Sequence, residues 1–178
     1  PPEGGSRVHM IWSDSPCWET CWNGGFKMQD ALRDESIECV VVQHPWMEND
    51  TMFADIILPS NTKFETEDIG TDCDSGQWNV VFYERQAIKP LGESKSDKEV
   101  VAEVAKKLEK FGGIYEDIYD KYLGGKTDDE WIRVGFDTSG APEGMSFEEF
   151  KEKQSYAFPT REDWKDIPAG IRQFHDDP

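Results

Sequence analysis

The sequence has few basic residues, no long apolar run and no leader segment that we can recognise. It carries 19 Lys and Arg against 37 Asp and Glu in 178 residues, which gives a formal net charge of −18. So acidic a chain repels polyanions, and we therefore expect neither nucleic acid nor a membrane as partner. No stretch approaches the length of about 20 apolar residues that a transmembrane helix needs. We expect a cytoplasmic protein.

The four cysteines form no familiar ligand set. Cys17 and Cys21 are four positions apart, but zinc and iron–sulfur sites need three or four ligands, and Cys39 and Cys73 supply no second pair. We expect reduced thiols and no metal ligand in this sequence. A Ser-His-Asp pattern, a phosphate loop and a Gly-x-Gly-x-x-Gly loop are also missing.

The apolar segments that are present predict an α/β domain. Residues 8–12, 37–43 and 54–58 are short apolar runs, and the last two are rich in β-branched residues and closed by prolines, as buried parallel strands are. A helix is expected over 25–35, with a buried stripe made of Phe26, Met28, Ala31 and Leu32. Strand, helix and strand in this order predict a right-handed parallel crossover.

A second helix is expected over 96–111. Ser96 and Glu99 have the spacing of a capping box, and Gly112 supplies the stop. Its apolar face is expected to consist of Val100, Val101, Val104, Ala105, Leu108 and Phe111. Residues 61–74 are polar and predict a loop, whereas 78–82 predict a strand or an extended segment.

The remaining residues predict a helix-rich and loop-rich extension. Thr127 and Ser146 each precede an acid by three positions and indicate two further capped helices. We therefore expect a three-layer α/β/α domain with a mainly parallel, flavodoxin- or Rossmann-like sheet over residues 1–112. An extension over 113–178 would follow. The chain begins Pro1-Pro2-Glu3, and we interpret it as a piece of a larger protein.

Two strings of residues resemble one protein family. Val40-Val41-Val42-Gln43-His44-Pro45 is followed by Ala54-Asp55-Ile56-Ile57-Leu58-Pro59, and the order and spacing resemble the dimethylsulfoxide reductase family of molybdenum enzymes. That family carries two molybdopterin guanine dinucleotides. The usual Thr-Glu-Thr before the second string is replaced here by residues 48–51, Glu-Asn-Asp-Thr. Asp55 itself is expected to be structural, paired with a nearby backbone group or cation.

The resemblance implies cofactor contacts where the strands end. Ser13-Asp14-Ser15-Pro16 stands where the family has Gly-x-Asn-Pro or Gly-x-Asp-Pro, so Ser13 and Ser15 would contact a dinucleotide, with Glu19 or Thr20 as the downstream polar contact. An ordinary strand-to-helix turn is the alternative, because Ser-Asp-Ser-Pro suits a turn equally well.

Gln43 and Asp97 are the candidate guanine contacts. An amide offers a base edge both a donor and an acceptor, and a carboxylate can accept from two N–H groups at once. His44 follows Gln43 and could line the same loop, although an ordinary loop histidine is the alternative. For Asp97 the alternative is helix capping and compensation of the helix dipole.

Residues 74–86 differ from the family's Glu-Gly-Arg-x-Gln region by carrying aromatic residues. Trp78 and Phe82 are expected in the core. Tyr83 is either a core residue or a substrate contact, because a phenol hydroxyl can donate a proton beside an aromatic substrate.

Within the family, these features are most similar to transhydroxylases that move a hydroxyl group between phenols with no net redox change. The resemblance implies molybdenum, two guanine dinucleotides per full-length chain, an anaerobic source, an iron–sulfur small subunit and a phenolic substrate. It also implies that further domains, a C-terminal barrel among them, complete the enzyme. The alternatives are a respiratory molybdenum reductase of a small oxyanion-type acceptor, or a non-enzymatic interaction module. The last predicts that Gln43, Asp97 and Ser15 lie far apart.

Overall fold

The structure is a computed structural model that describes residues 3–71, 79–160 and 162–163. The chain divides into two compact units, and each is treated by itself. Unit 1 contains residues 3–68 and 84–131. Unit 2 contains the described residues of 69–83 together with those from 132 onward. The expected division at residue 112 stays a prediction. Residues 174–178 resemble the approach to the family's C-terminal barrel and lie outside the described residues.

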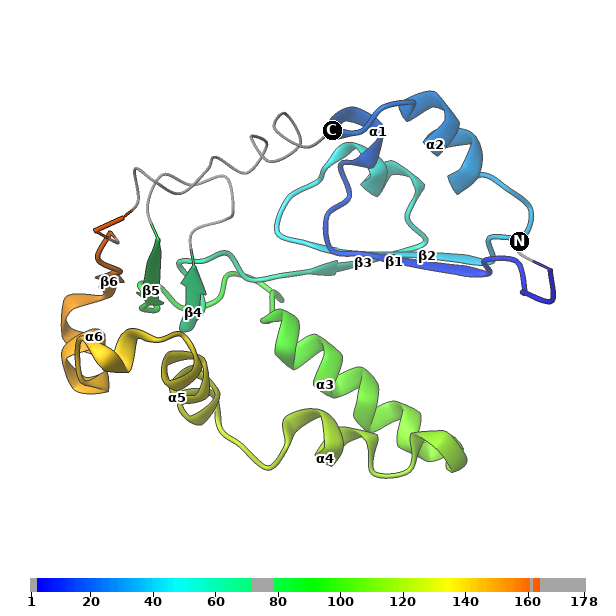
Figure 1. Cartoon of the computed structure of the whole chain (residues 1–178). Coiled ribbons are helices and arrows are strands. Elements are labelled where there is room, and N and C mark those ends of the chain that lie inside the picture. Colours follow the sequence, from blue (N-terminus) through cyan, green and yellow to red (C-terminus); the bar gives the residue numbers. More distant parts are fainter. Residues whose placement is uncertain (1–2, 72–78, 161, 164–178) are drawn as a thin grey trace. The chain divides into compact units, whose positions relative to one another are not determined.

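Unit 1 is built on a parallel sheet (Figure 1). Its strands are β1 (Met10–Ser13), β2 (Cys39–His44) and β3 (Ile56–Pro59), in the order β1-β2-β3. Ser13 pairs with Val42, and His44 pairs with Pro59. An isolated parallel bridge between Ser60 and Lys95 continues the pairing past the end of β3. The carboxyl ends of all three strands therefore meet at one edge.

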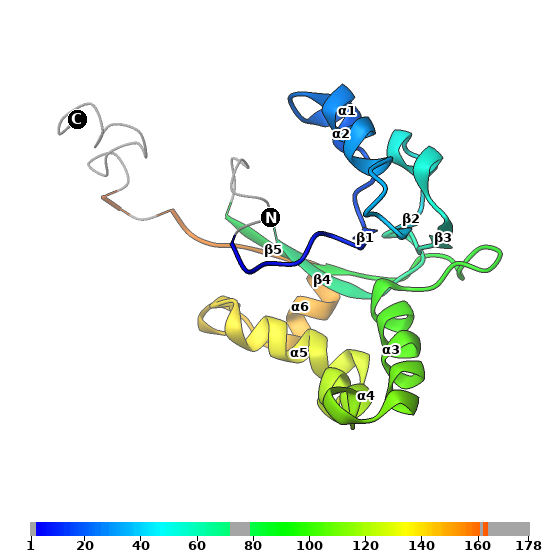
Figure 2. The same cartoon turned by 90° about the vertical axis from the view of Figure 1, so that its right-hand side faces the viewer.

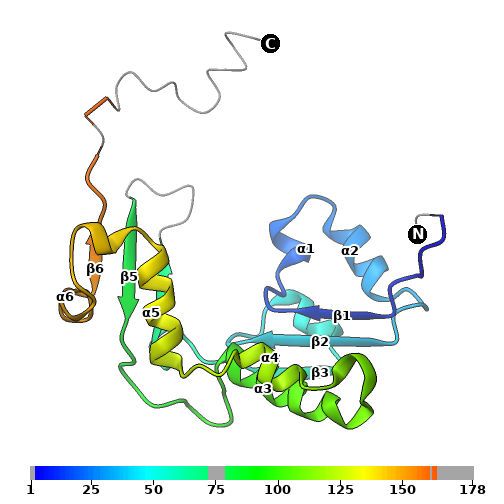
Figure 3. The same ribbon diagram turned by 60° about the horizontal axis from the view of Figure 1, so that its bottom comes forward.

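Helices cover both faces of this sheet, which confirms the three-layer α/β/α class (Figures 1 and 3). On one face lie α1 (Trp18–Cys21), α2 (Gly25–Leu32) and the 3-10 turn η1 (Asn49–Phe53). Leu32 packs there with Val40 and Val42 in a small buried core. On the other face lies α3 (Asp97–Leu108), followed by η2 (Glu109–Phe111), η3 (Gly113–Tyr115) and α4 (Ile118–Leu123).

Two local features fix the helices of unit 1. Ser96 and Glu99 form the expected capping box, in which each side chain bonds the other residue's backbone N–H. Helix α2 packs so closely on α1 that a Cβ at Gly25 would lie 1.9 Å from the carbonyl oxygen of Glu19. Glycine is therefore needed at this helix start for its small size.

Unit 2 has a sheet in the order β4-β5-β6, formed by β4 (Asp68–Thr71), β5 (Val80–Glu84) and β6 (Ser155–Ala157). Strands β5 and β6 are antiparallel. Helices α5 (Asp128–Thr138) and α6 (Phe147–Lys153), with η4 (Ala141–Glu143) between them, lie beside the sheet (Figure 2). In its core, the ring of Phe136 contacts the rings of both Phe147 and Phe150. The caps expected at Thr127 and Ser146 are both present.

Several expectations about these elements were wrong. Strand β4 lies within the segment that we expected to be a loop. Phe26 is 82% exposed and Phe111 78% exposed, although both were assigned to buried faces, and Ala31 is exposed as well. On α2 the inward residues are Met28 and Leu32, one turn apart, and Phe26 points elsewhere because it is half a turn from Met28.

Phe82 was also expected in the core, but it is 39% exposed. Val81 and Tyr83 point into the core, and side chains alternate along a strand, so Phe82 takes the opposite face. Trp78 lies outside the described residues. Among the residues that the structure describes, no helix has the length and apolar character that crossing a bilayer requires.

Candidate functional site

A chain of hydrogen bonds joins the ends of the strands in unit 1. The indole Nε1 of Trp12 donates to Oε1 of Gln43 at 3.1 Å, and Nε2 of Gln43 donates to Oδ1 of Asp97 at 2.6 Å. The Ser60 hydroxyl donates to the same Oδ1 at 2.9 Å. Gln43 is 4% exposed and Ser60 5%, whereas Asp97 is exposed. We call these four residues the carboxyl-edge relay.

The relay brings together two residues that lie 54 positions apart in sequence. The interaction-module hypothesis required Gln43 and Asp97 to be far from each other, and their direct contact contradicts it. Ser96 caps the helix, so Asp97 is not its cap, whereas compensation of the helix dipole stays open for Asp97 because it is an acid in the first turn. Among the described residues, Oδ2 of Asp97 has no hydrogen-bond partner and the side chain reaches solvent.

The loop after β1 is held at the same edge of the sheet. Ser13 is buried, and its hydroxyl accepts the backbone N–H of Ser15, which is itself exposed. Asp50 is 4% exposed and accepts the backbone N–H groups of Trp18 and Glu19 at 2.8 and 3.0 Å. The backbone N–H of Asp50 donates to the carbonyl of Pro16. Residue 50 therefore fastens this loop to the connection between β2 and β3.

The other candidate contacts make local bonds. Glu19 accepts from the side-chain amide of Gln29, and the Thr20 hydroxyl donates to the carbonyl of Cys17. The His44 ring lies against the backbone of Trp46. Asp55 accepts the backbone N–H of Val40, which confirms its structural role. The cofactor contacts of Ser13, Ser15, Glu19, Thr20, Gln43, His44 and Asp97 stay predictions.

A buried carboxylate, that of Glu65, stabilises the loops next to the relay. Glu65 is 4% exposed and accepts from the backbone and hydroxyl of Thr62 and from the backbone N–H of Leu91. The Thr62 donors and then Leu91 hold the pKa of Glu65 below its ordinary value. Thr62 lies two residues after Ser60, and Leu91 lies six residues before Asp97. Glu65 therefore links the two loops that carry Ser60 and Asp97.

Lys63 is a cation that lies near the relay. Lys63 donates to Glu84 at 2.7 Å, and this partner raises the pKa of Lys63 most, with a smaller contribution from the negative charge of Asp97. The positive charge partly offsets the exposed carboxylate, so an approaching ligand meets neighbouring charges of both signs.

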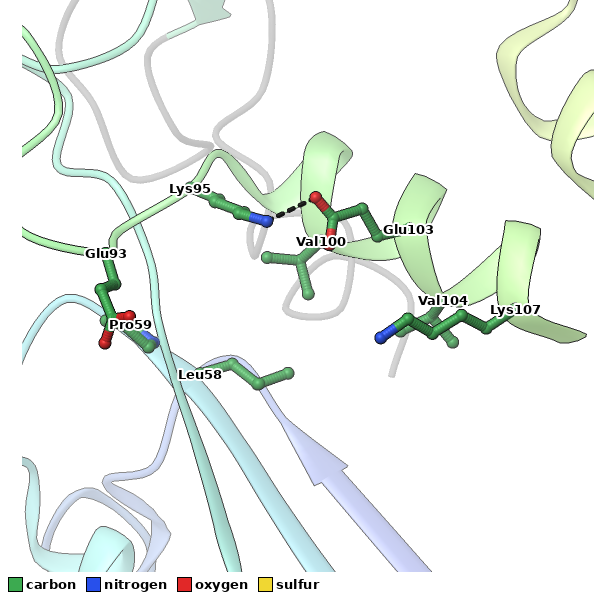
Figure 4. A pocket seen from close by; sticks show the side chains of 8 residues that line it. All are labelled: Leu58, Pro59, Glu93, Lys95, Val100, Glu103, Val104 and Lys107. Carbon is green, nitrogen blue, oxygen red and sulfur yellow. Dashed lines mark hydrogen bonds and ion pairs between the residues drawn. The ribbon is translucent and has the colours of Figure 1, made fainter.

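A cavity of about 300 Å³ lies next to the relay, between the end of β3 and α3 (Figure 4). Its apolar surface comes from Leu58, Pro59, Val100 and Val104, and its charged side chains are Glu93, Lys95, Glu103 and Lys107. Figure 4 shows Lys95 reaching Glu103, with which it pairs. Pro59 and Lys95 directly precede Ser60 and Ser96, so the cavity opens beside the strand ends.

Tyr83 belongs to unit 2, where it is 4% exposed. Its ring packs 6.1 Å from that of Phe150, and Nζ of Lys151 lies 5.3 Å from its centre. This burial favours the core role of the two alternatives. Its contact with a substrate stays a prediction.

The thiols offer no metal centre. Cys17, Cys21 and Cys39 are free, and a hydrogen bond with Cys21 is the main cause that raises the pKa of Cys17. Among the described residues, no three His, Cys, Asp or Glu side chains come close enough to hold a metal ion. Cys73 lies outside the described residues.

The polar groups of Gln43, Ser60 and Asp97 fit the guanine end of a nucleotide better than they fit a metal ion. A carboxylate with one unoccupied oxygen at the surface can accept an N–H group of a base, and the amide behind it keeps that carboxylate in place. Sequence reasoning missed Trp12 and Ser60, although both stand at strand ends. It also missed Glu65, whose spacing from Thr62 is that of a capping box. Nothing in the sequence indicated the role of Asp50 except its place in residues 48–51, which replace the family's Thr-Glu-Thr.

Comparison with known proteins identifies what this chain is similar to. Residues 22–107 match the family model described as Molybdopterin oxidoreductase. The chain thus contains a molybdopterin oxidoreductase domain and has homologues in the dimethylsulfoxide reductase family. This match implies molybdenum and molybdopterin as the cofactor.

Among its relatives is the pyrogallol hydroxytransferase large subunit of Pelobacter acidigallici, which is 28% identical over 169 residues, covering 89% of this chain and 18% of that protein. Dimethyl sulfoxide reductase DmsA of Escherichia coli (strain K12) is 29% identical over 147 residues, covering 82% of this chain and 17% of the reductase.

Acetylene hydratase from Pelobacter acetylenicus shares the fold, with a TM-score of 0.58 and 18% identity over 89% of this chain and 19% of that chain. The chain thus spans less than one fifth of the length of each of these three proteins.

Proposed function

We propose that the carboxyl-edge relay holds the guanine end of one molybdopterin guanine dinucleotide. The observation that supports this most is the contact of Gln43 with Oδ1 of Asp97 at 2.6 Å, which leaves Oδ2 of this exposed residue without a hydrogen-bond partner among the described residues. Guanine presents two N–H groups side by side on one edge, and a carboxylate is an acceptor-only partner for them. Ser13 and Ser15 lie at the end of the neighbouring strand, where polar groups of the same nucleotide would be in reach.

In this proposal the residues of this chain bind and orient the cofactor, and the cofactor carries out the reaction. Asp97 accepts from the base, Gln43 and Ser60 fix the carboxylate, and Asp50 keeps the Ser13–Thr20 loop against the sheet. When bound, the molybdenum cofactor supplies oxygen-transfer and redox chemistry.

For the parent protein we propose hydroxyl transfer between phenols, from pyrogallol toward phloroglucinol, with an iron–sulfur small subunit as partner. Similarity to the pyrogallol hydroxytransferase large subunit over 89% of this chain supports this reaction. A reductase of a small acceptor is the second candidate, supported by similarity to dimethyl sulfoxide reductase DmsA over 82% of the chain. Tyr83 would contact the phenol only if the core of unit 2 opened, since it is 4% exposed.

The site is tested by titrating the 178-residue chain with guanosine monophosphate (GMP) in a calorimeter. Asp97→Asn should weaken binding by about 10- to 100-fold, because it removes a charged acceptor. Asp120→Asn is the matched control, since Asp120 is exposed on α4 away from the relay. Equal affinity of Asp97→Asn and the unaltered chain would refute the assignment.

The cofactor and reaction are tested on the parent protein purified without oxygen. Molybdenum and acid-released GMP in a ratio of about one to two would support the dinucleotide cofactor. Assays with pyrogallol and with dimethyl sulfoxide then separate the two candidate reactions. Absence of both molybdenum and guanine from the purified parent would contradict the cofactor proposal.

A further inference from the structure

Trp12 and Gln43 lie behind Asp97, and we infer that they are positioning residues that set the preference of this site for a base edge with N–H donors. The inference rests on the proposed guanine site and adds how its selectivity arises. Within the part of the chain that the structure describes, the one side-chain hydrogen bond of Trp12 is to Gln43. It therefore acts on a ligand through Gln43 and Asp97.

The orientation of the Gln43 amide follows from its two neighbours. An indole N–H can only donate, so the amide oxygen of Gln43 must face Trp12. A carboxylate can only accept, so the amide nitrogen must face Asp97. Trp12 and Asp97 therefore require the same orientation of the Gln43 amide. The Gln43 side chain is 4% exposed, so water has little access to compete for its two hydrogen bonds.

This fixed amide determines what Asp97 offers to a ligand. Gln43 and Ser60 both donate to Oδ1, so that oxygen already has two partners at 2.6 and 2.9 Å. Oδ2 is left as the outward acceptor. A base edge with N–H groups complements an outward acceptor, whereas adenine places a ring nitrogen acceptor at the equivalent position and is repelled.

Without the indole donor, the amide of Gln43 loses one of the two contacts that select its orientation, and its buried oxygen loses its partner. A turned amide would present its oxygen to Asp97, and two acceptors would then face each other. The carboxylate would rotate away or take up water, and the preference for guanine over adenine would shrink. The indole is 39% exposed, so its replacement by Phe keeps most of the local packing.

The test uses the 178-residue chain and calorimetric titration with GMP and with adenosine monophosphate (AMP). Trp12→Phe and Gln43→Ala should each weaken GMP binding by about tenfold and reduce the ratio of GMP to AMP affinity. The double variant should bind GMP no more weakly than Gln43→Ala alone, because Trp12 acts through Gln43. Trp22→Phe is the matched control, since Trp22 is 69% exposed and lies at the end of α1, outside the relay.

The outcomes separate this inference from the function on which it rests. Failure of the unaltered chain to bind GMP overturns the guanine site and the inference with it. Binding that Asp97→Asn abolishes but Trp12→Phe leaves unchanged overturns the inference alone. Additive losses in the double variant also overturn it, because they mean that Trp12 acts by another route. Circular dichroism and urea midpoints identify a misfolded variant, and if Trp12→Phe is misfolded, Gln43→Ala removes the same interaction from the other partner.

Discussion

Replacement of Asp50 offers the sharpest test of how the loop after β1 is held. Its carboxylate accepts two backbone N–H groups, from Trp18 and Glu19, and is 4% exposed. Loss of an acidic cap at a helix start costs about 0.5–2 kcal/mol. We expect the upper part of this range for Asp50→Ala, because the carboxylate is buried and caps two donors.

A loss of about 2 kcal/mol predicts two measurable changes. The urea midpoint should fall by about 1 M, given a denaturant slope of about 2 kcal/mol per molar. If the loop opens locally, hydrogen exchange at the amides of Trp18 and Glu19 should quicken by up to about 30-fold. Asp50→Asn should behave similarly, because an amide can accept from one donor but turns its NH₂ group toward the other.

Asp14→Asn is the control, since Asp14 is an exposed acid in the same loop and its replacement makes the same change of charge. It should leave both measurements within about 0.5 kcal/mol of the unaltered chain. Unchanged exchange at Trp18 and Glu19 in Asp50→Ala would show that the two hydrogen bonds do not hold this helix, and the reasoning would be refuted.

Two further predictions concern stability. Phe150→Ala should destabilise unit 2 by about 3–5 kcal/mol in urea denaturation, because Phe150 is fully buried, whereas Phe82→Ala on the exposed face should cost far less. A loss from Phe150→Ala no larger than that from Phe82→Ala would contradict the core assignment. Glu65 has a lowered pKa, so its stabilising effect is present above the ordinary pKa and is lost as pH falls through the folded-state value. The urea midpoint of Glu65→Gln should therefore change less between about pH 6 and about pH 3 than that of the unaltered chain, and parallel profiles would count against this.

Elements formed by local contacts were predictable from the sequence. The capped starts of α3, α5 and α6 follow from spacings of three residues, and all three caps are present. The parallel strands were predictable because each is a short apolar run that ends in polar residues or a proline. The candidate site was located for the same reason, since the ends of parallel strands meet at one edge.

The parts that failed depend on contacts between distant residues. Strand β4 has a polar sequence, and its strand character comes from its pairing with β5. Phe26 and Phe111 have the spacing of apolar helix faces in the sequence, yet both side chains are mostly exposed in the structure. The relay illustrates the same limit, because no local pattern says that the indole of Trp12 will reach Gln43 across 31 positions.

The position of unit 2 in the sequence has a consequence for the order of events during synthesis. The chain leaves unit 1 after Asp68 and returns to it at Glu84, but β5 pairs with β6, which begins at Ser155. At a ribosomal rate of about 5–20 residues per second, the inner side chains of β5 wait roughly ten seconds for their partners. During that interval Val81 and Tyr83 lack the partners that β6 supplies, so a nascent chain of this kind depends on protection from aggregation until β6 emerges.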